Sequence, residues 1–364
     1  MDPVAHTLVG ASLAKTRLGR LTPLATVTLL LAANAPDIDA IAMFLDRETS
    51  LHVRRGWTHG ILAIAVLPVI ITGLMVGLDR LRYIILKRNA EPVALKPLLL
   101  LSYLGVLSHP MLDWLNTYGI RLLMPFDDRW FYGDALFIVD PWIWLLASSA
   151  VVLAHTRATT SITLWIVAAG ASSSLILTND VTPIEAKLFW CLGLGCLVGL
   201  RIWGGLQARI SQVAIKSLLA IFVYISSMAL GSQVAKTQVR QWLHAEGIPL
   251  NKIMAGPVPA NPFVRDVVVQ GPHRYYFLQV NWLAADQIRP TSPSIAIGDK
   301  SPVVQAALRA PHIKGTRHWM RFPTYQVEQT TNGYEVIISD ARYSRRPGGL
   351  GTIRVVLDHQ LNVQ

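Results

Sequence analysis

Long apolar runs alternate with short polar loops over the first two thirds of the chain. Runs of a length that spans a bilayer, about 17 to 25 residues, are expected near 58–79, 97–117, 137–154, 160–178, 186–204 and 213–233. Two shorter apolar stretches, 3–16 and 22–36, are separated by Leu18-Gly19-Arg20 and predict a hairpin of two short helices in the membrane. The pattern is typical of a polytopic helical membrane protein.

The pattern changes after residue 233. Short runs rich in β-branched and aromatic residues predict strands at 267–269, 275–280, 334–338 and 352–357. Turn residues separate them at Gly271-Pro272, Asn332-Gly333 and Pro347-Gly348-Gly349. We therefore expect a mainly α protein, with a polytopic helical transmembrane domain at 1–233 and a small, soluble, β-rich (α+β) domain at 234–364 that carries a mostly antiparallel sheet.

Composition supports the membrane assignment and narrows the partners. The chain is 52% hydrophobic and only 15% charged, whereas a soluble domain has about 25% charged residues. A net charge of +11 raises the question of nucleic-acid binding. The positive charge lies in short loops between apolar runs, as the positive-inside rule expects. We therefore expect no nucleic-acid partner.

The distribution of charge in the loops also predicts the topology. Loop 80–96 contains five basic residues and is expected in the cytoplasm, which places the acidic loop 118–136 and the C-terminal domain on the outer, periplasmic side. Counting back toward the N-terminus, the outer ends of the first helices carry several His and Asp residues. They are His6, Asp37, Asp39, His59, His109 and Asp113.

Asp and His are costly at membrane depth, where they usually pair, bind an ion or line a polar cavity. They are also ligands of hydrolytic metal centres. His109 and Asp113 are four residues apart, so on a helix both side chains lie on one face and can reach one ion. A buried His–Asp hydrogen bond without metal is the alternative.

The other candidates lie in short motifs at the ends of apolar runs. Pro36 disfavours helix at Ala35, which places Asp37 as a helix-terminal ligand or a cap. Asp39 could bridge a second ion or act as the general base. His59 follows Thr58, the expected N-cap of the next helix. His6 and His59 could instead be satisfied interface residues.

These considerations give one expected site. The metal ligands are expected to be His6, Asp37, His59, His109 and Asp113, and the catalytic residues Asp39 and Asn116. Asn116 could orient the substrate or a ligand. Asp134 and Asp140 are expected either to support the ligands or to cap helices.

The ordered motifs resemble a known family. Asn34-Ala35-Pro36-Asp37-Ile38-Asp39, Arg55-Gly56-Trp57-Thr58-His59-Gly60 and Ser108-His109-Pro110-Met111-Leu112-Asp113-Trp114 are similar to those of the YdjM-like family of bacterial inner-membrane proteins, regarded as metal-dependent hydrolases. Asp340-Ala341-Arg342-Tyr343 also resembles that family. More distantly, the chain is similar to zinc-dependent phospholipase C and P1-type nucleases. It lacks their second helix with His-x-x-x-His or His-x-x-x-Glu, which favours one or two zinc ions over three.

We therefore expect metal-assisted hydrolysis at the outer face of the inner membrane. A bound metal lowers the pKa of its water to about 7, and two ions about 3.5–4 Å apart can clamp a phosphoester. The location and the resemblance indicate a membrane lipid or another amphiphile, through a phosphoester or other ester, as the substrate. The alternatives are an ion- or proton-coupled transporter and a non-catalytic membrane protein whose outer β domain binds a partner.

Overall fold

A computed structural model of the 364-residue chain describes residues 1–86, 91–156, 158–180, 182–343 and 351–364. Part of the predicted cytoplasmic loop, with Lys87 and Arg88, and the predicted turn at Pro347-Gly348-Gly349 lie outside the described residues. The helices of the N-terminal region are α1 (Pro3–Lys15), α2 (Ala25–Asn34), α3 (Arg47–Val53), α4 (Ile61–Leu86), α5 (Leu95–Trp114), α6 (Pro141–His155), α7 (Thr159–Leu177), α8 (Ile184–Trp203) and α9 (Ile210–Ala245).

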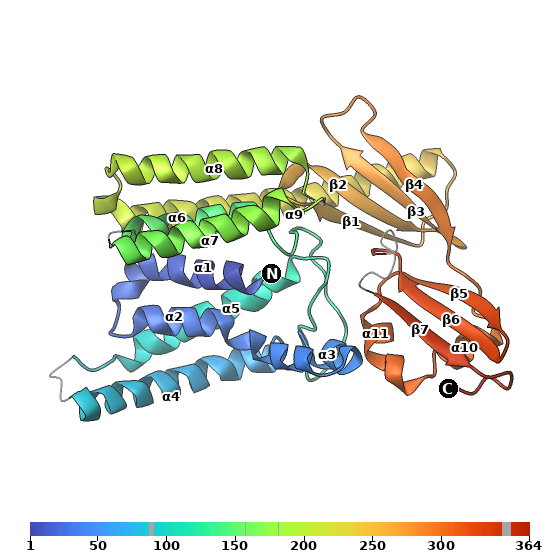
Figure 1. The fold of residues 1–364 in the computed structure, drawn as a ribbon, viewed down its shortest axis with the longest axis horizontal. Coiled ribbons are helices and arrows are strands. Elements are labelled where there is room, and N and C mark those ends of the chain that lie inside the picture. The colour runs from blue at the N-terminus through green and yellow to red at the C-terminus, as the bar shows by residue number, and fades with distance from the viewer. Residues whose placement is uncertain (87–90, 157, 181, 344–350) are drawn as a thin grey trace. The chain divides into compact units, whose positions relative to one another are not determined.

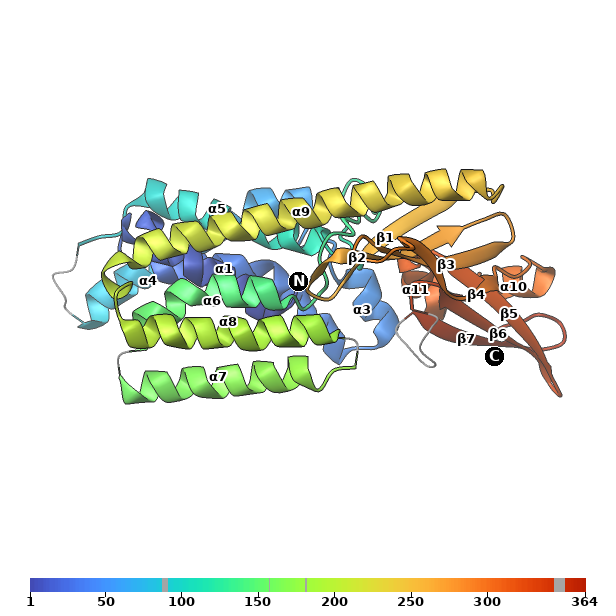
Figure 2. The same cartoon turned by 90° about the horizontal axis from the view of Figure 1, so that it is seen from above.

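Six helical segments in the described part of the chain are long and apolar enough to cross a membrane. They are Ala25–Phe44, Ile61–Ile85, Leu95–Trp114, Thr159–Leu177, Ile184–Trp203 and Gln207–Ala245. Within the helical unit, α1, α2 and α4 to α8 lie side by side with their axes roughly parallel or antiparallel (Figures 1 and 2). The predicted polytopic helical fold is confirmed.

Two predicted segments differ from the structure. The apolar run at 137–154 forms only the 15-residue helix α6, about 22 Å long against a hydrocarbon core of about 30 Å. It starts late because Asp140 caps it and Pro141 occupies its first turn. Conversely, the run expected to end at residue 36 continues as the 3-10 helix Ala35–Phe44. Ala35 keeps right-handed helical dihedrals, so Pro36 ends the α-helix without turning the chain away.

Residue contacts divide the chain into two compact units. The first comprises Met1–Ile38, Arg55–Gly231 and Gly256–Pro262, and the second Asp39–Arg54, Ser232–Ala255 and Phe263–Gln364. The segment Asp39–Arg54, which includes α3, thus belongs to the unit that holds the β-sheets. Within that unit, the backbone N–H of Thr316 donates to Glu48 Oε2 at 2.9 Å and fastens α3 to α11 (Lys314–Trp319).

Close helix contacts position the functional residues of the first unit. A side chain at Gly105 of α5 would meet Ala32 Cβ of α2 at 2.5 Å, and one at Gly10 of α1 would meet Ala33 Cβ at 2.9 Å. Small residues let transmembrane helices approach closely. Because Gly105 lies one turn before His109, this approach brings the α2 backbone against the His109 ring.

The second unit contains two β-sheets instead of the single sheet predicted. Their strands are β1 (Lys252–Val258), β2 (Asn261–Gln270), β3 (Arg274–Asn281) and β4 (Ile288–Ala296) in one sheet, and β5 (Pro323–Thr330), β6 (Gly333–Asp340) and β7 (Thr352–Leu357) in the other. β2 to β4 and β5 to β7 pair antiparallel in chain order. The four predicted strands are β2, β3, β6 and β7, and the turns at Gly271-Pro272 and Asn332-Gly333 are confirmed.

Candidate metal centre

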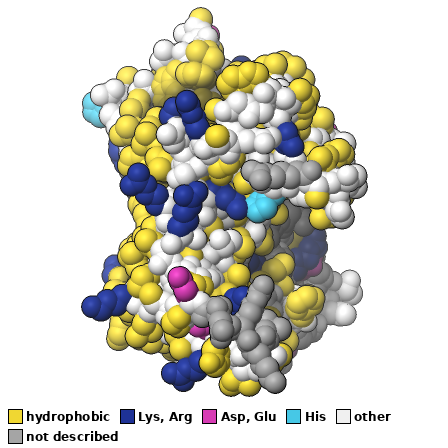
Figure 3. Space-filling view, turned by 90° about the vertical axis from the view of Figure 1, so that its left-hand side faces the viewer, with side chains coloured by type: hydrophobic (Ala, Val, Ile, Leu, Met, Phe, Trp, Pro, Cys, Tyr) yellow, Lys and Arg dark blue, Asp and Glu magenta, His cyan; other side chains and the backbone are white. Residues whose placement is uncertain are grey.

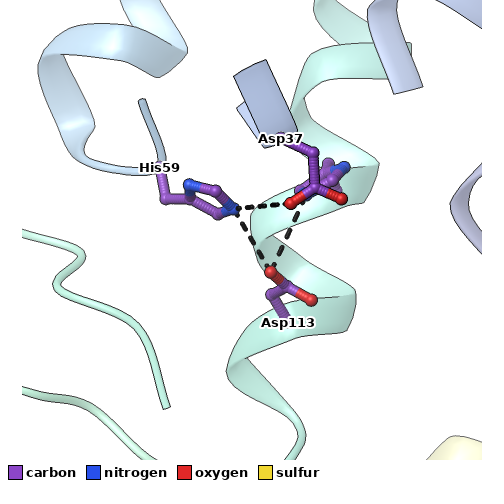
Figure 4. A group of neighbouring side chains, drawn as sticks. Asp37, His59 and Asp113 are labelled. Atoms are coloured by element: carbon purple, nitrogen blue, oxygen red, sulfur yellow. Dashed lines mark ion pairs between the residues drawn. The ribbon is translucent and has the colours of Figure 1, made fainter. Parts of the chain in front are cut away.

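Four predicted ligands meet in the helical unit. Asp37 comes from the 3-10 helix after α2, His59 from the turn before α4, and His109 and Asp113 from α5. One donor atom of each lies within 4.8 Å of the donors of the other three. Figure 4 shows Asp37, His59 and Asp113 pointing toward one another from separate segments. The structure brings these four predicted residues together, and their role as metal ligands stays a prediction.

The distances between donor atoms suit a shared cation better than direct hydrogen bonds. His59 Nε2 lies 3.2 Å from Asp113 Oδ2 and 3.9 Å from Asp37 Oδ1. His109 Nε2 lies 3.6 Å from Asp37 Oδ1 and 3.7 Å from Asp113 Oδ2. Two ligands of one tetrahedral zinc ion, with bonds of about 2.0–2.1 Å, are about 3.3 Å apart. Most of the observed spacings exceed a hydrogen bond and lie near that value.

The His109 ring is oriented as a metal ligand. Its Nδ1 lies 2.7 Å from the backbone oxygen of Ala33. A carbonyl oxygen only accepts, so Nδ1 carries a proton, and Nε2 of the neutral ring keeps a lone pair. In a neutral ring that lone pair faces two carboxylates, and either a proton or a metal ion between them removes the repulsion. A backbone carbonyl on the outer nitrogen is the usual support of a metal-bound His.

His59 has a similar support, and burial defines how the site is reached. His59 Nδ1 lies 3.0 Å from Thr58 Oγ1. Thr58 is therefore not the predicted N-cap, because α4 begins three residues later at Ile61. The side chains of His59, His109 and Asp113 are fully buried, whereas Asp37 is 16% exposed. A water or substrate molecule would reach the group from the side of Asp37.

Arg55 binds the carboxylate oxygen of Asp113 that does not face His59 and His109. Arg55 Nη2 donates to Asp113 Oδ1 at 3.1 Å, while Nη1 donates to Asn116 Oδ1 at 3.1 Å and to the Gly119 oxygen. The guanidinium also stacks on Tyr118, 4.6 Å from the ring centroid. Arg55 itself adopts a left-handed backbone conformation, φ 54°, which costs a non-Gly residue energy and is enriched at functional sites. Asp113 is thus held with Oδ2 directed toward His59 and His109.

His6 lies beside the four-residue group. Its ring stacks on that of His109 at 3.6 Å between centroids, and its Nε2 lies 3.3 Å from Asp113 Oδ1. The amine of Met1 contacts the same oxygen. His6 as a further ligand stays a prediction.

The two predicted catalytic residues have other partners in the structure. Asn116 Oδ1 accepts from Arg55 and from the backbone N–H groups of Tyr118 and Gly119, so Asn116 positions Arg55 and shapes this loop. Asp39 belongs to the second unit, where its Oδ1 lies 4.0 Å from Arg54 Nε. The catalytic roles of both residues stay predictions.

Asp140 is a helix cap, one of its two predicted roles. Its Oδ1 accepts from the backbone N–H groups of Trp142 and Ile143, and its Oδ2 from the Tyr224 hydroxyl at 2.8 Å. Asp134 is fully buried with φ 53°, in a loop whose neighbouring backbone N–H groups bond to the end of α5.

Sequence reasoning missed the support that Arg55 gives to Asp113. A signal was present: the predicted topology puts His59 at an outer helix end, and the segment that precedes it contains Arg47, Arg54 and Arg55. A basic residue that departs from the positive-inside pattern is a candidate for a role beyond topology. The Ala33 carbonyl that orients His109 left no signal, because any residue supplies a backbone oxygen.

Comparison with known proteins agrees with the predicted resemblance. Residues 1–181 match the family model described as YdjM inner membrane protein. The chain is also similar to the uncharacterized protein YfhP of Bacillus subtilis (strain 168), with 25% identity over 137 residues that cover 38% of each chain. The aligned region thus spans well under half of that relative. No solved structure matches the chain.

Proposed function

Since the chain is a membrane protein of the YdjM family, we propose that it is a membrane-embedded, metal-dependent hydrolase. Asp37, His59, His109 and Asp113 would hold the ion. The observation that carries the proposal is the His109 ring, whose Nδ1 donates to a backbone oxygen while Nε2 faces two carboxylates. Two imidazoles with two carboxylates suit zinc. One ion accounts for these four ligands, and a second would need His6 or Asp39.

The chain's own groups have distinct roles in this reaction. When bound, a divalent ion acts as a Lewis acid and yields a nucleophilic water near neutral pH. Arg55 would hold Asp113 aimed at the ion, and Asn116 keeps Arg55 in place. Asp37 forms the open edge where substrate enters. The role of general base expected for Asp39 rests on the sequence alone, because Asp39 belongs to the other compact unit.

Exposed apolar side chains next to the ligands in sequence favour an amphiphilic substrate. Ile38 is 61% exposed, Trp57 59%, Met111 56% and Trp114 43%. These residues flank Asp37, His59 and Asp113. Such a rim would sit in lipid or against an acyl chain while the ester reaches the ion. We propose a phosphoester or other ester of a membrane lipid.

The charge on the helix ends supports placing the metal centre at the outer face. Lys and Arg side chains outnumber acids on the face at the helix ends remote from the ligands (Figure 3), and α1 and α8 carry Lys15 and Arg201 in their last turns. Basic loops mark the cytoplasmic side. The ligand end would then face the periplasm of a bacterial inner membrane, and the charge of the loops independently predicts the same side for the C-terminal domain.

Metal content and hydrolysis test this proposal together. The detergent-purified full-length protein is analysed for bound metals, beside His109→Ala, Asp113→Ala and the exposed control His312→Ala. We expect near-stoichiometric zinc in the wild type and the control, with a loss in both ligand variants. Hydrolysis of a chromogenic phosphodiester and of phospholipids should follow metal content. Metal-free wild-type protein that neither binds added zinc nor gains thermal stability from it would refute the proposal.

A further inference from the structure

An apolar cavity lies among α6, α7 and α8, away from the proposed metal ligands. Its volume is about 460 Å³, within the range of small-molecule sites. Most lining side chains are apolar; they include Trp144, Leu145, Val152, Ile162, Trp165, Ala169, Trp190 and Leu194. The indole N–H groups of Trp144 and Trp190 donate to Asp2 and Ser173, so both are already satisfied.

Helix α1 separates this cavity from the metal centre. Leu8 lines the cavity, whereas His6 stacks on His109. Residues two apart on a helix differ by about 200° in direction, so the two side chains point to opposite sides of α1. The cavity is therefore a different site from the one that would hold the scissile ester.

Hydrocarbon is the natural occupant of such a cavity. Helices α7 and α8 are both candidate membrane spans, and α7 is nearly all exposed within the structure. Apolar cavities do not hold water well. Along α6, the lining runs from Trp144 to Thr156, about 18 Å. One leaflet of the hydrocarbon core is about 15 Å deep, so one acyl chain matches this length.

One end of the cavity is cationic. Arg201 lines it and donates from Nε to Thr156 Oγ1 at 2.5 Å and to the Thr156 oxygen at 3.1 Å. A second cation is close to this end of the cavity. Lys15 Nζ lies 3.1 Å from Nε2 of His155, the residue that precedes Thr156. Among the described lining residues there is no Asp or Glu. Arg201 is in the last turn of α8, and the basic face in Figure 3 is the left-hand side of Figure 1, where α8 has one of its ends.

We propose that this cavity binds one acyl chain of an anionic phospholipid. The phosphate contacts Arg201 at the basic end, and the chain extends between α6, α7 and α8 toward Trp144 and Trp190. The arrangement combines a cation that selects the head group with an apolar slot that takes the chain. Such a lipid fills the space beside the loosely packed α7, and its binding does not depend on the proposed hydrolase activity.

Native mass spectrometry of the full-length protein in mild detergent tests this site. The probes are phosphatidylglycerol, phosphatidylcholine with the same chains, and glycerol 3-phosphate. We expect one phosphatidylglycerol to be retained at least tenfold more strongly than phosphatidylcholine, and no retention of glycerol phosphate. Arg201→Gln should abolish the preference between the two lipids, and Arg201→Lys should restore part of it.

Cavity-filling variants locate the bound chain. Ala169→Trp on α7 and Leu194→Trp on α8 project into the slot from two walls and should each weaken phosphatidylglycerol retention tenfold or more. Leu164→Trp is the control, because Leu164 is on α7 but is 67% exposed and does not line the cavity. The proposal would be overturned if Ala169→Trp, Leu194→Trp and Leu164→Trp all retained phosphatidylglycerol equally. It would also be overturned if the wild type retained phosphatidylglycerol and phosphatidylcholine equally. Unchanged zinc content in the filled variants would show that they fold and that the two sites are separate.

Discussion

The protein contains two buried Asp–Arg pairs with similar surroundings and different consequences. Asp113 pairs with Arg55 in the helical unit, and Asp340 pairs with Arg342 in the β-sheet unit. Each arginine is almost fully buried and stacks on an aromatic ring, Arg55 on Tyr118 and Arg342 on Trp319 at 4.7 Å. Both pairs lie in motifs that resemble the same family.

The pairs differ in what the carboxylate oxygens face. Oδ1 of Asp340 accepts from the backbone N–H and Nε of Arg342, and Oδ2 accepts from Arg342 Nη2 and the backbone N–H groups of Arg321 and Phe322. Both oxygens therefore have donors within the fold. Asp113 Oδ1 binds Arg55, but its Oδ2 has no hydrogen bond within the described structure and faces two imidazole nitrogens. Both carboxylate oxygens of Asp340 are thus hydrogen-bonded within the fold, so the Asp340–Arg342 pair is structural. The Asp113–Arg55 pair leaves Oδ2 of Asp113 available to bind an ion.

Asp113→Asn should therefore have the largest effect. The change removes a proposed ligand and leaves Arg55 buried without its carboxylate, a loss that costs about 3–5 kcal/mol in buried pairs. We expect zinc content and hydrolysis to fall to background and the melting temperature to drop. Elemental analysis and thermal unfolding in detergent check this, with the exposed Asp286→Asn as control. Full zinc content in Asp113→Asn would contradict the assignment of this residue.

Asp340→Asn should destabilise the sheet unit without affecting metal. Removing one partner of a buried, hydrogen-bonded pair costs about 3–5 kcal/mol, while the zinc ligands all lie in the other unit. Hydrogen exchange of β6 should accelerate and zinc content should not change. Glu335→Gln is the control, because its pair with Arg354 is largely exposed and is worth about 0–1 kcal/mol. A loss of zinc in Asp340→Asn would abolish the distinction between the two pairs.

Acid should weaken the same structural pair. Burial by itself raises the pKa of Asp340, but Arg342 and the backbone N–H donors outweigh it and hold the pKa below its ordinary value. A lowered folded pKa gives stability that is complete above the unfolded value of about 3.9 and is lost as the pH falls through the folded one. The stability gap between wild type and Asp340→Asn, measured by β6 exchange, should therefore be constant from pH 5 to 7 and narrow below about pH 4. A stability difference between the two proteins that grows as the pH falls would contradict a lowered pKa of Asp340.

The sequence was sufficient to predict most of the long helices and the meeting of four His and Asp residues, for physical reasons. Apolar length alone identifies a membrane-spanning helix, and the spacing of His109 and Asp113 places them on one helix face. It was insufficient for the strands β1, β4 and β5, which are all edge strands of their sheets. β4 contains Pro290 and Pro293, which a central strand would not tolerate. β1, β4 and β5 lack the continuous apolar run that made β2, β3, β6 and the edge strand β7 visible.

The contacts that orient the proposed ligands could not be predicted from the sequence either, because they join segments far apart in the chain. Arg55 reaches Asp113 across 58 residues, and His109 reaches the Ala33 oxygen across 76. Neither contact has a local spacing rule like that of a helix face. Asp140 was predictable as a cap because its partners are the next residues of its own helix.

Arg55→Lys should have an intermediate effect on the metal centre. Lysine keeps the charge but cannot donate to Asp113 and Asn116 from one rigid fork. Partners that orient a metal ligand are typically worth about 10–100-fold in metal affinity or activity. We expect a zinc affinity weaker by that factor, with less destabilisation than in Asp113→Asn. A competition titration with a zinc chelator measures it, and wild-type affinity in Arg55→Lys would show that charge alone suffices.

The smallest effect is expected at Thr58, because its hydroxyl orients His59 from outside the cluster and Asp113 Oδ2 restrains the same ring from inside. Thr58→Val preserves the shape and removes the hydroxyl, whereas Thr58→Ser keeps the hydroxyl. We expect Thr58→Val to weaken zinc binding by about tenfold, the lower end for such partners, and Thr58→Ser to remain near wild type. The same titration compares the two. If both variants bind zinc equally, the ion and Asp113 alone fix the imidazole of His59. Of the two hydrogen bonds to the outer imidazole nitrogens, only the one that supports His109 would then contribute to zinc affinity.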